Sequence, residues 1–135
     1  MFKKVTLDTK TTDKFVISIA ELKDYIPFEV KRVYYLCDIK QPTSQHCHMI
    51  EEEFFVQVAG TSTAVIDKGE GREDISLSAG EGIYVPSFVW HGFKNTSSDA
   101  IILALSSTNY SPDRSDYLED YDAYLKIRDE KLKSS

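Results

Sequence analysis

Short apolar runs, several of them alternating with polar residues, are separated by turn-forming residues along most of the chain. A period of two is typical of strands with one buried face, and β-branched and aromatic residues favour strands. We therefore predict strands at 14–19, 30–39, 53–60, 61–67, 75–80, 82–86 and 100–107. Between them we expect a break at 25–29 around Pro27, a loop at 41–45 and a glycine-containing turn at 68–74. Many short strands at roughly even spacing predict an all-β sandwich or barrel.

The C-terminal residues follow a different pattern, in which apolar and tyrosine side chains recur at helical spacing. One helix is predicted at about 115–133. Its packing stripe would comprise Tyr117, Leu118, Tyr121, Tyr124, Leu125 and Leu132. Ser115 is the expected N-cap, with acidic residues in the first turn and lysines near the end, as the helix dipole favours. We see neither a repeat nor a linker, so residues 1–135 are predicted to form a single domain.

Composition and charge limit the classes of partner. The 135 residues are 41% hydrophobic and 28% charged, and the net charge of −6 argues against nucleic acid as the main partner. Cys37 and Cys47 make no disulfide framework, and the N-terminus lacks the apolar core of a secretory signal. Apolar runs stay well short of the ~20 residues that cross a bilayer. We expect a soluble cytoplasmic protein with neither nucleic-acid nor membrane partners.

The three histidines of the chain fall in two short segments, and one of these segments also carries carboxylates. His46 and His48 stand in the stretch HCHMIEEEFF. On a strand they would share one face because side chains alternate, and Cys47 would point into packing on the other face. Glu53 begins the next predicted strand, and His91 follows a predicted turn.

Two segments around these residues resemble the conserved signatures of the cupin barrels. The first signature is matched by His46, His48, Glu53 and Gly60. The second, about twenty residues further on, is matched by Gly80, Pro86, His91 and Asn95. Phe88 departs from it, because the signature has glycine there. The resemblance implies a double-stranded β-helix, or jelly roll, with all three histidines at the mouth of the barrel.

Three imidazoles and a carboxylate in one cavity allow more than one chemistry. His46, His48, Glu53 and His91 form a complete ligand set for Mn, Fe, Ni or Zn with open coordination positions. Acid–base catalysis on a bound sugar is the second possibility, because an imidazole pKa of about 6.5 lies near working pH. The third is a polar barrel mouth whose histidines are satisfied by hydrogen bonds and have no function.

Several stretches carry a resemblance that is more specific than the cupin signatures. These are residues 26–38, 46–48, 85–93, 97–110 and 115–125. They resemble the nucleotide-sugar 3,4-ketoisomerases, the FdtA, QdtA or WxcM-like cupins. The resemblance implies an isomerase that moves the carbonyl of dTDP-4-keto-6-deoxy-D-glucose from C4 to C3 in deoxyamino-sugar biosynthesis. It also implies one cupin domain with a C-terminal helix, a homodimer and a reaction that needs no metal or other cofactor.

The resemblance also implies catalytic roles by position. His46 is the expected general base, which removes the acidic proton next to the ketone, gives an enediolate and returns the proton. His48 lies on the same face and is expected to orient His46 or the sugar. Tyr34 is expected to donate to a sugar oxygen or to shuttle protons there.

Four further residues are expected to contact the substrate. Arg32 lies on the same strand face as Tyr34 and would bind the diphosphate, with a surface position as the alternative. His91 and Trp90 would border the sugar ring, with core packing as the alternative for Trp90. Glu53 is expected to face the cavity.

The sequence departs from the family pattern at three places. Arginines that the family commonly carries are missing from 12–15 and 42–45. Glu53 stands where relatives tend to have glutamine, whereas Glu51 and Glu52 are expected in a solvated strand entry. Two other functions therefore stay open. One is a metal-dependent cupin enzyme, a dioxygenase or metal isomerase, and the other is a non-catalytic sugar-binding cupin. The C4 configuration of the product, galacto or gluco, is not predicted.

Overall fold

Short strands make up most of the structure, as the alternating pattern predicts. The computed structural model describes the backbone of residues 1–134 and the side chains of residues 1–131. In chain order the strands are β1 (Lys3–Thr6), β2 (Asp8–Thr11), β3 (Val16–Ile19), β4 (Arg32–Cys37), β5 (Cys47–His48), β6 (Glu53–Ala59), β7 (Thr61–Asp67), β8 (Arg72–Ser78), β9 (Glu81–Val85), β10 (Trp90–Lys94), β11 (Ile101–Ser106) and β12 (Tyr117–Leu118). The helices are α1 (Leu22–Tyr25) and α2 (Tyr121–Ser134).

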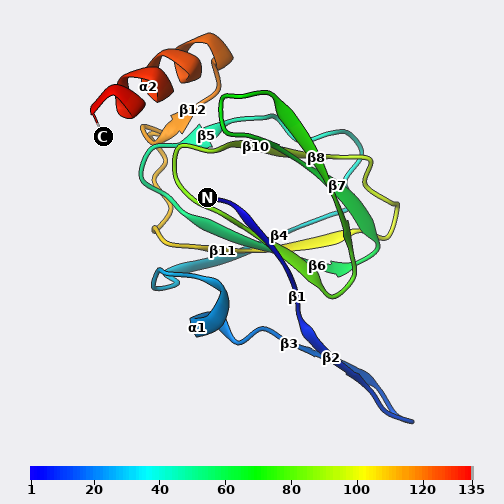
Figure 1. Ribbon diagram of the computed structural model, residues 1–135. Helices are drawn as coiled ribbons and strands as arrows, with labels where there is room; N and C mark the ends of the chain where they lie inside the picture. The colour runs from blue at the N-terminus through cyan, green and yellow to red at the C-terminus, as the bar shows by residue number, and fades with distance from the viewer. Residues whose placement is uncertain (135) are drawn as a thin grey trace.

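Two antiparallel sheets face each other, and this arrangement agrees with the predicted jelly roll (Figure 1). The larger sheet has the order β1-β9-β6-β11-β4, and the smaller has the order β10-β7-β8. A two-stranded pair, β12-β5, meets the edge of the smaller sheet through a bridge between His46 and His91. The polar residues of the two cupin-like signatures therefore lie at one end of the barrel.

Strand β6 shows how both faces of the larger sheet are used. Phe55 packs into the core between the two sheets, together with residues of β7, β8, β9, β10 and β11. Phe54 and Val56 point to the opposite face, where partly buried residues between 20 and 30 cover them. Glu53 shares the inner face with Phe55 because strand side chains alternate. Alternation thus carries one carboxylate to the polar end of the apolar core.

The C-terminal segment differs from the prediction. Helix α2 begins at Tyr121 rather than at Ser115, and the side chain of Asp120 caps it by accepting from the backbone N–H of Ala123 at 3.1 Å. Tyr117 and Leu118 instead pair with β5 as strand β12. Tyr121, Tyr124 and Leu125 do pack onto the barrel, as the predicted stripe requires. Leu132 of that stripe lies outside the described side chains.

Other boundaries also differ from the prediction. Strands β1, β2 and β10 were not expected, and β8 begins at Arg72, inside the predicted turn. The hairpin formed by β2 and β3 projects away from the barrel (Figure 1). Neither helix in the described part of the chain has the length and apolar character that a bilayer crossing requires.

Phe88 explains the one departure from the second cupin signature. It adopts a φ of 64°, in the left-handed region where glycine is preferred because it has no Cβ. Its backbone is fixed there, since its N–H donates to the His48 carbonyl at 2.7 Å and its own carbonyl accepts from the Tyr124 hydroxyl at 2.9 Å. Hydrogen bonds therefore hold a phenylalanine where the signature has glycine.

Candidate active site

Three strands bring the predicted histidines and Glu53 together. Strand β10 lies beside the chain at His46, where the two backbones exchange hydrogen bonds: His46 N–H donates to the His91 carbonyl at 3.0 Å, and His91 N–H donates to the His46 carbonyl at 2.8 Å. His48 ends β5, two residues further along. Glu53 begins β6, paired with Ser106 on one side and Val85 on the other. The sequence prediction that these side chains meet is confirmed.

The four polar side chains form one tight cluster. The Nε2 atoms of His46 and His48 are 3.1 Å apart. Glu53 Oε1 lies 3.1 Å from His48 Nε2 and 3.3 Å from His91 Nε2. The other oxygen of Glu53, Oε2, accepts a hydrogen bond from the Tyr34 hydroxyl. Tyr34 therefore joins the cluster, as its expected role requires.

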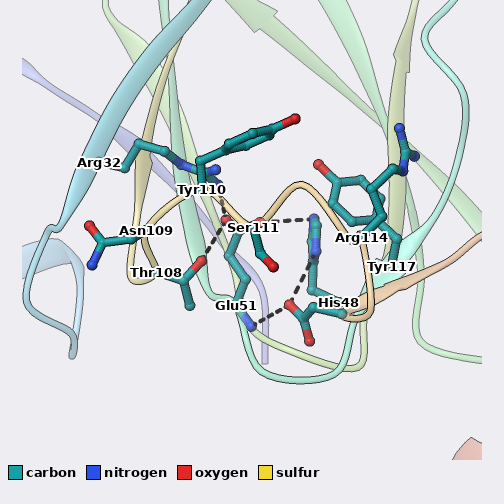
Figure 2. Close-up of a pocket in the computed structure, with 10 residues that line it drawn as sticks. Arg32, His48, Glu51, Thr108, Asn109, Tyr110, Ser111, Arg114 and Tyr117 are labelled. Atoms are coloured by element: carbon teal, nitrogen blue, oxygen red, sulfur yellow. Dashed lines mark hydrogen bonds and ion pairs between the residues drawn. The ribbon is translucent and has the colours of Figure 1, made fainter.

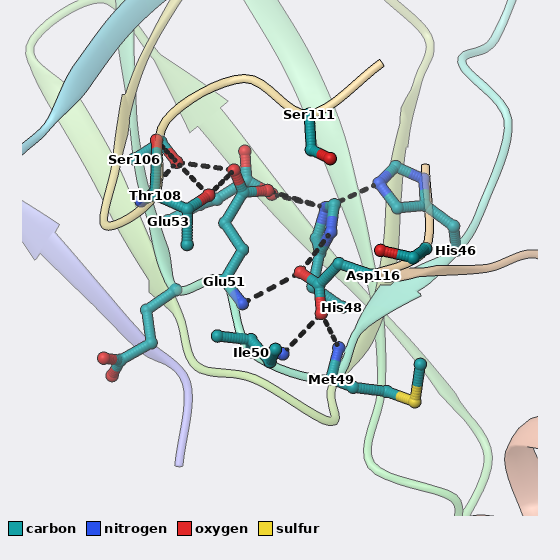
Figure 3. A network of polar contacts seen from close by, with 12 residues as sticks. His46, His48, Met49, Ile50, Glu51, Glu53, Ser106, Thr108, Ser111 and Asp116 are labelled. Carbon is teal, nitrogen blue, oxygen red and sulfur yellow. Dashed lines mark hydrogen bonds and ion pairs between the residues drawn. The ribbon is translucent and has the colours of Figure 1, made fainter. Parts of the chain in front are cut away.

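His48 is enclosed on the side away from His46. Its Nε2 lies 3.0 Å from Glu51 Oε2, and Glu51 Oε1 accepts a hydrogen bond from the Ser106 hydroxyl at 2.5 Å (Figure 3). Glu51 Oε1 also accepts a hydrogen bond from Arg32. Glu51 is 3% exposed, so the expectation of a solvated strand entry is wrong for this residue. Its charge is compensated there by Arg32, by His48 and by the Ser106 hydroxyl, so burial is tolerated.

Asp116 holds the turn that carries Glu51. Its Oδ1 accepts from the backbone N–H groups of Met49 and Ile50 at 3.0 and 2.7 Å, and its Oδ2 accepts from that of Glu51 at 3.0 Å (Figure 3). Oδ2 also lies 3.4 Å from His48 Nδ1. A residue expected in the first turn of a helix thus organises a loop that is distant in sequence.

Tyr117 is one of the site residues that sequence analysis missed. It was assigned to a helix stripe, but its ring stacks on His46 with centroids 4.9 Å apart and meets His48 edge-on at 4.6 Å. The Arg114 guanidinium lies over the Tyr117 ring, with its Cζ atom 4.3 Å from the ring centroid. Figure 2 shows Tyr117 and Arg114 facing Arg32 across a small pocket. The strand pairing of β12 is what turns this ring toward the histidines.

Trp90 is placed differently from its expected role. It is 3% exposed and packs between Tyr121 and Tyr124 under α2, beside Cys47. Its indole N–H donates to Gln45 at 3.1 Å. Because His91 points to the cluster, its neighbour on the strand must point to the opposite face. The predicted substrate contact of Trp90 is therefore wrong, and its alternative, core packing, is confirmed, as is the packing of Cys47.

Arg32 and Tyr34 share one face of β4, as predicted, because the exposed residues of that strand alternate with them. The Arg32 guanidinium, however, is engaged by Glu51 and by the Ser106 hydroxyl at 3.3 Å. It forms part of the wall of two neighbouring pockets. Arg32 is thus paired with a buried carboxylate of this chain, and it is not a solvated surface arginine.

A cavity of about 250 Å³ opens beside the histidine cluster. Its polar rim includes Tyr34, His46, His91 and Glu53, and its apolar wall includes Phe55 and Phe93. Arg114 and Tyr117 also line it. A ligand in this cavity would meet the exposed edge of His46, whereas His48 lies behind it, 3% exposed. We call the His46, His91 and Tyr117 surface the open side, and His48, Glu51, Arg32 and Asp116 the closed side.

The two neighbouring histidines have opposite shifts in pKa. Burial and the nearby His91 and His48 lower the pKa of His46 to about 4. Burial also acts to lower the pKa of His48, but the contacts with Glu51 and Glu53 outweigh it and raise this pKa to about 9. At neutral pH His46 is therefore an uncharged base and His48 a cation, 3.1 Å apart.

The carboxylates and tyrosine around them support this state. Burial opposes ionisation of Glu53, but its contacts with His48 and His91 dominate and hold the pKa of Glu53 well below its usual range. The pKa of Glu51 is lowered as well, because contacts with His48 and Ser106 outweigh burial. Burial, then the charge of Glu53, raises the pKa of Tyr34 far above its ordinary value. Tyr34 therefore keeps its hydroxyl proton at neutral pH and can donate a hydrogen bond.

Comparison with known proteins identifies a family that covers nearly the whole chain. The family described as "FdtA: WxcM-like, C-terminal" matches residues 2–129. A curated relative, TDP-4-oxo-6-deoxy-alpha-D-glucose-3,4-oxoisomerase from Aneurinibacillus thermoaerophilus, is 36% identical over 93% of this chain and 87% of its own length.

Solved structures give the same result. A 3,4-ketoisomerase from Helicobacter canadensis is 28% identical and superposes with a TM-score of 0.85, covering 95% of this chain and 97% of its own. The WlaRB TDP-quinovose 3,4-ketoisomerase from Campylobacter jejuni is also 28% identical. It superposes with a TM-score of 0.83 and covers 93% of this chain and 97% of its own.

Proposed function

This chain belongs to the FdtA family of WxcM-like proteins, and on that premise we propose that it is a 3,4-ketoisomerase of a TDP-linked sugar. The substrate is TDP-4-keto-6-deoxyglucose, the sugar named for the curated relative. The product is its 3-keto isomer, which suits a later amination at C3 in deoxyamino-sugar and glycan synthesis. The observation that carries the proposal is the pair of His46 and His48, whose Nε2 atoms are 3.1 Å apart, with His46 at the edge of a cavity that Tyr34 also lines.

The reaction moves two hydrogens within the sugar, and the cluster offers a base and two donors for it. His46 Nε2 takes the proton from C3, and the electron pair left behind moves into a C3–C4 double bond while charge develops on the C4 oxygen. Tyr34, which lines the cavity, donates a proton to that oxygen, and the charge of His48 behind His46 stabilises the developing negative charge. The proton on His46 then returns to C4, the C3 hydroxyl gives its proton back to Tyr34, and the carbonyl stands at C3. Protons and electrons balance without an external oxidant.

The positions of the charges favour this assignment. A cationic His48 lowers the energy of an adjacent enediolate, and Glu53 remains ionised because His48 and His91 surround it. Tyr117 covers His46 with a flat aromatic face. Such a face suits a sugar ring or holds the imidazole in place. We propose that His91 and Glu53 contact the sugar from the rim of the cavity.

We assign the diphosphate contact to Arg114 rather than to Arg32. Arg114 lines the cavity next to Tyr117 and its side chain is 57% exposed, in a surface ion pair with Glu119 at 2.5 Å. Exposed ion pairs contribute little, typically ~0–1 kcal/mol, so a phosphate can displace Glu119. Arg32 is committed to the buried Glu51, whose charge would be left uncompensated if Arg32 turned away. Arg114 thus supplies a cation to the cavity of a chain that lacks the family's arginines at 12–15 and 42–45.

We also propose that the protein is a homodimer. The projecting hairpin exposes the apolar side chains of Phe15, Val16 and Ile17, and the outer face of β4 exposes Val33 and Tyr35. Apolar clusters of this kind mark interaction surfaces. Sedimentation velocity should give twice the chain mass, and a Val16→Asp, Tyr35→Asp double variant should give one chain mass. A wild-type monomer at ~100 µM would refute this part.

A cytoplasmic location is our proposal too. Cys37 is an exposed free thiol, which suits a reducing compartment. Cell fractionation followed by immunoblotting tests it, and recovery of the protein with an extracytoplasmic fraction would contradict it.

The activity is tested with the purified protein, EDTA and TDP-4-keto-6-deoxyglucose in deuterium oxide. NMR should show the 3-keto product and deuterium at the exchanging positions, and the coupling constants at C4 report its gluco or galacto configuration. If the substrate stays unchanged and unlabelled while the protein still binds TDP, the chain is a sugar-binding protein and the proposed activity is wrong.

A further inference from the structure

A second cavity, of about 510 Å³, has no lining residue in common with the cavity beside the histidine cluster. It lies between α2 and the chain that leads into β10, with the turn between β7 and β8 at its rim. One wall is apolar and is formed by Pro86, Phe88 and Val89. Small-molecule sites have volumes of roughly 300–1,000 Å³ and largely apolar walls with a few convergent polar groups. The size and the wall therefore suit a small organic molecule.

The charged side chains of this cavity are mostly cations. Lys68, Arg128 and Lys131 line it, whereas Glu70 is the one carboxylate among the lining residues. The whole chain has a net charge of −6, so the cavity reverses the sign of the molecule locally. The nearest carboxylate paired with Lys68 is that of Glu73, at 4.0 Å from its Nζ. A concave surface with this excess of positive charge attracts anions.

Arg128 is built into the turn between β7 and β8. Its Nη1 donates to the Gly69 carbonyl, and Gly69 leaves room for the guanidinium, because a Cβ at this position would collide with the Arg128 side chain. Nη2 pairs with the exposed Asp129 at 2.7 Å. Nε is buried and has no hydrogen-bond partner among the described residues. Buried donors are nearly always paired, so Arg128 has a donor in excess of what the described chain satisfies.

Phe88 gives the cavity an aromatic wall at a conformational cost. Its φ of 64° lies in the left-handed region, where glycine avoids the steric penalty of a Cβ. Residues in such a conformation are found where the structure around them holds them, and they cluster at ligand sites. Lys131 Nζ lies 3.6 Å from the centroid of the Phe88 ring. The ring therefore presents apolar surface next to a cation.

We propose that this cavity, which we call the cationic pocket, binds a small organic anion that carries a phosphoryl group on an aromatic body. The phosphoryl group would contact Lys68, Arg128 and Lys131, because guanidinium and ammonium groups form charge-assisted hydrogen bonds with phosphate. The aromatic body would cover Phe88 and Val89 and remove their apolar surface from water. Three cations suit a dianionic phosphoryl group better than a single carboxylate.

The cationic pocket shares two residues with the support of the histidine cluster. The backbone N–H of Phe88 donates to the His48 carbonyl at 2.7 Å, and the Val89 carbonyl lies 2.9 Å from His91 Nδ1. A ligand that contacts the side chains of Phe88 and Val89 bears on the same residues whose backbones contact the two histidines. Binding should therefore shift the ring resonances of His91 although the ligand does not touch that ring.

Phenyl phosphate is the probe, titrated at constant pH into the isotope-labelled chain and followed by NMR. Saturable shifts are expected at the backbone amides of Gly69, Phe88 and Arg128, together with the ring shift of His91. Inorganic phosphate should bind at least ~10-fold more weakly, because it lacks the body that covers the apolar wall.

Two variants and a control locate the site. Arg128→Gln should weaken phenyl phosphate binding ~10-fold or more, because it removes charge-assisted hydrogen bonds. Phe88→Gly places glycine where the backbone favours it, so the variant should keep the wild-type circular dichroism and lose the preference for phenyl phosphate over inorganic phosphate. Lys126→Gln removes a positive charge of α2 outside the pocket and should bind as the wild type does.

Three results would overturn the pocket. These are amide shifts confined to the cavity at His46, equal phenyl phosphate affinities in Phe88→Gly and Lys126→Gln, and equal affinities of the wild type for phenyl phosphate and inorganic phosphate, which would show an anion held by surface charge alone. A His91 ring shift that persists in Phe88→Gly after the Gly69 shift is lost would mean direct binding at the histidines and would refute the coupling. None of these measurements uses the isomerase reaction, so the pocket and the proposed function fail separately.

Discussion

The open and closed sides of the histidine cluster show how one short motif yields two different side chains. His46 and His48 are separated by one residue and have the same chemistry, yet burial with His91 and His48 beside it lowers the pKa of His46 to about 4, while Glu51 and Glu53 raise that of His48 to about 9. His46 borders the cavity, whereas His48 is 3% exposed and is surrounded by ionised groups. The carboxylates that the fold places beside His48 account for the difference. They make His48 a cation, whereas His46 stays an uncharged base.

The largest expected effect comes from removing the base on the open side. His46→Asn should retain TDP binding and lose ~10²–10⁴-fold in kcat, as is usual when a general base is removed. Because His46 carries no charge at neutral pH, its loss should leave the free energy of unfolding nearly unchanged. Steady-state kinetics and thermal melting check both statements. A near-normal rate would move the base to His91 or His48.

The next largest effect is on the stability of the closed side. Glu51→Gln should lower the free energy of unfolding by ~3 kcal/mol, because removing one partner of a buried ion pair leaves Arg32 and His48 uncompensated. Glu52→Gln is the matched control and should cost less than ~1 kcal/mol, since its partner Tyr84 is neutral. Urea unfolding measures both. Equal losses in the two variants would contradict the contrast between the sides.

The pH dependence of kcat tests the difference between His46 on the open side and His48 on the closed side. His46 must be neutral to act, so kcat should fall as the pH drops below about 4, the pKa of His46. His48 must be protonated, so kcat should also fall as the pH rises above about 9, its own pKa. Glu51, Glu53, Asp116 and His91 are the charged or titratable groups that face this pair. A plateau between these limits is expected, with circular dichroism recorded at each pH to exclude unfolding, whereas a single limb near pH 6.5 would oppose it.

A smaller effect is expected from the ring that covers the open side. Tyr117→Leu removes the stacking on His46 and should lower kcat/KM by ~2–10-fold, because such ring contacts contribute ~0.5–1.5 kcal/mol. Tyr117→Phe keeps the stacking and should remain near the wild-type value. If the phenylalanine variant loses as much as the leucine variant, the hydroxyl rather than the ring is what matters.

The faces to which the residues of the short histidine motif point were predictable from the sequence, because they follow local rules. Alternation in a strand places His46 and His48 on one face and Cys47 on the other. The same rule applied to Trp90 and His91 would have placed Trp90 in the packing under α2. The signal for that correction was already present in the sequence.

The closed side, and Tyr117 on the open side, could not be predicted in the same way, because they depend on contacts between distant segments. Asp116 bonds the turn at residues 49–51, and Ser106 bonds Glu51. Ser115 and Asp120 are equally good N-caps by local chemistry, and pairing of β12 with β5 is what moves the start of the helix to Tyr121. Tyr117 therefore reached the site through tertiary structure that no local pattern encodes.

The most direct test of the central claim is an NMR titration of the three imidazoles in metal-free protein, with resonances assigned by single His→Asn variants. The account predicts that His46 titrates near pH 4 and His48 near pH 9, so that one is a free base and the other a cation throughout the neutral range. Both rings titrating together near pH 6.5, or His48 losing its proton before His46, would contradict it.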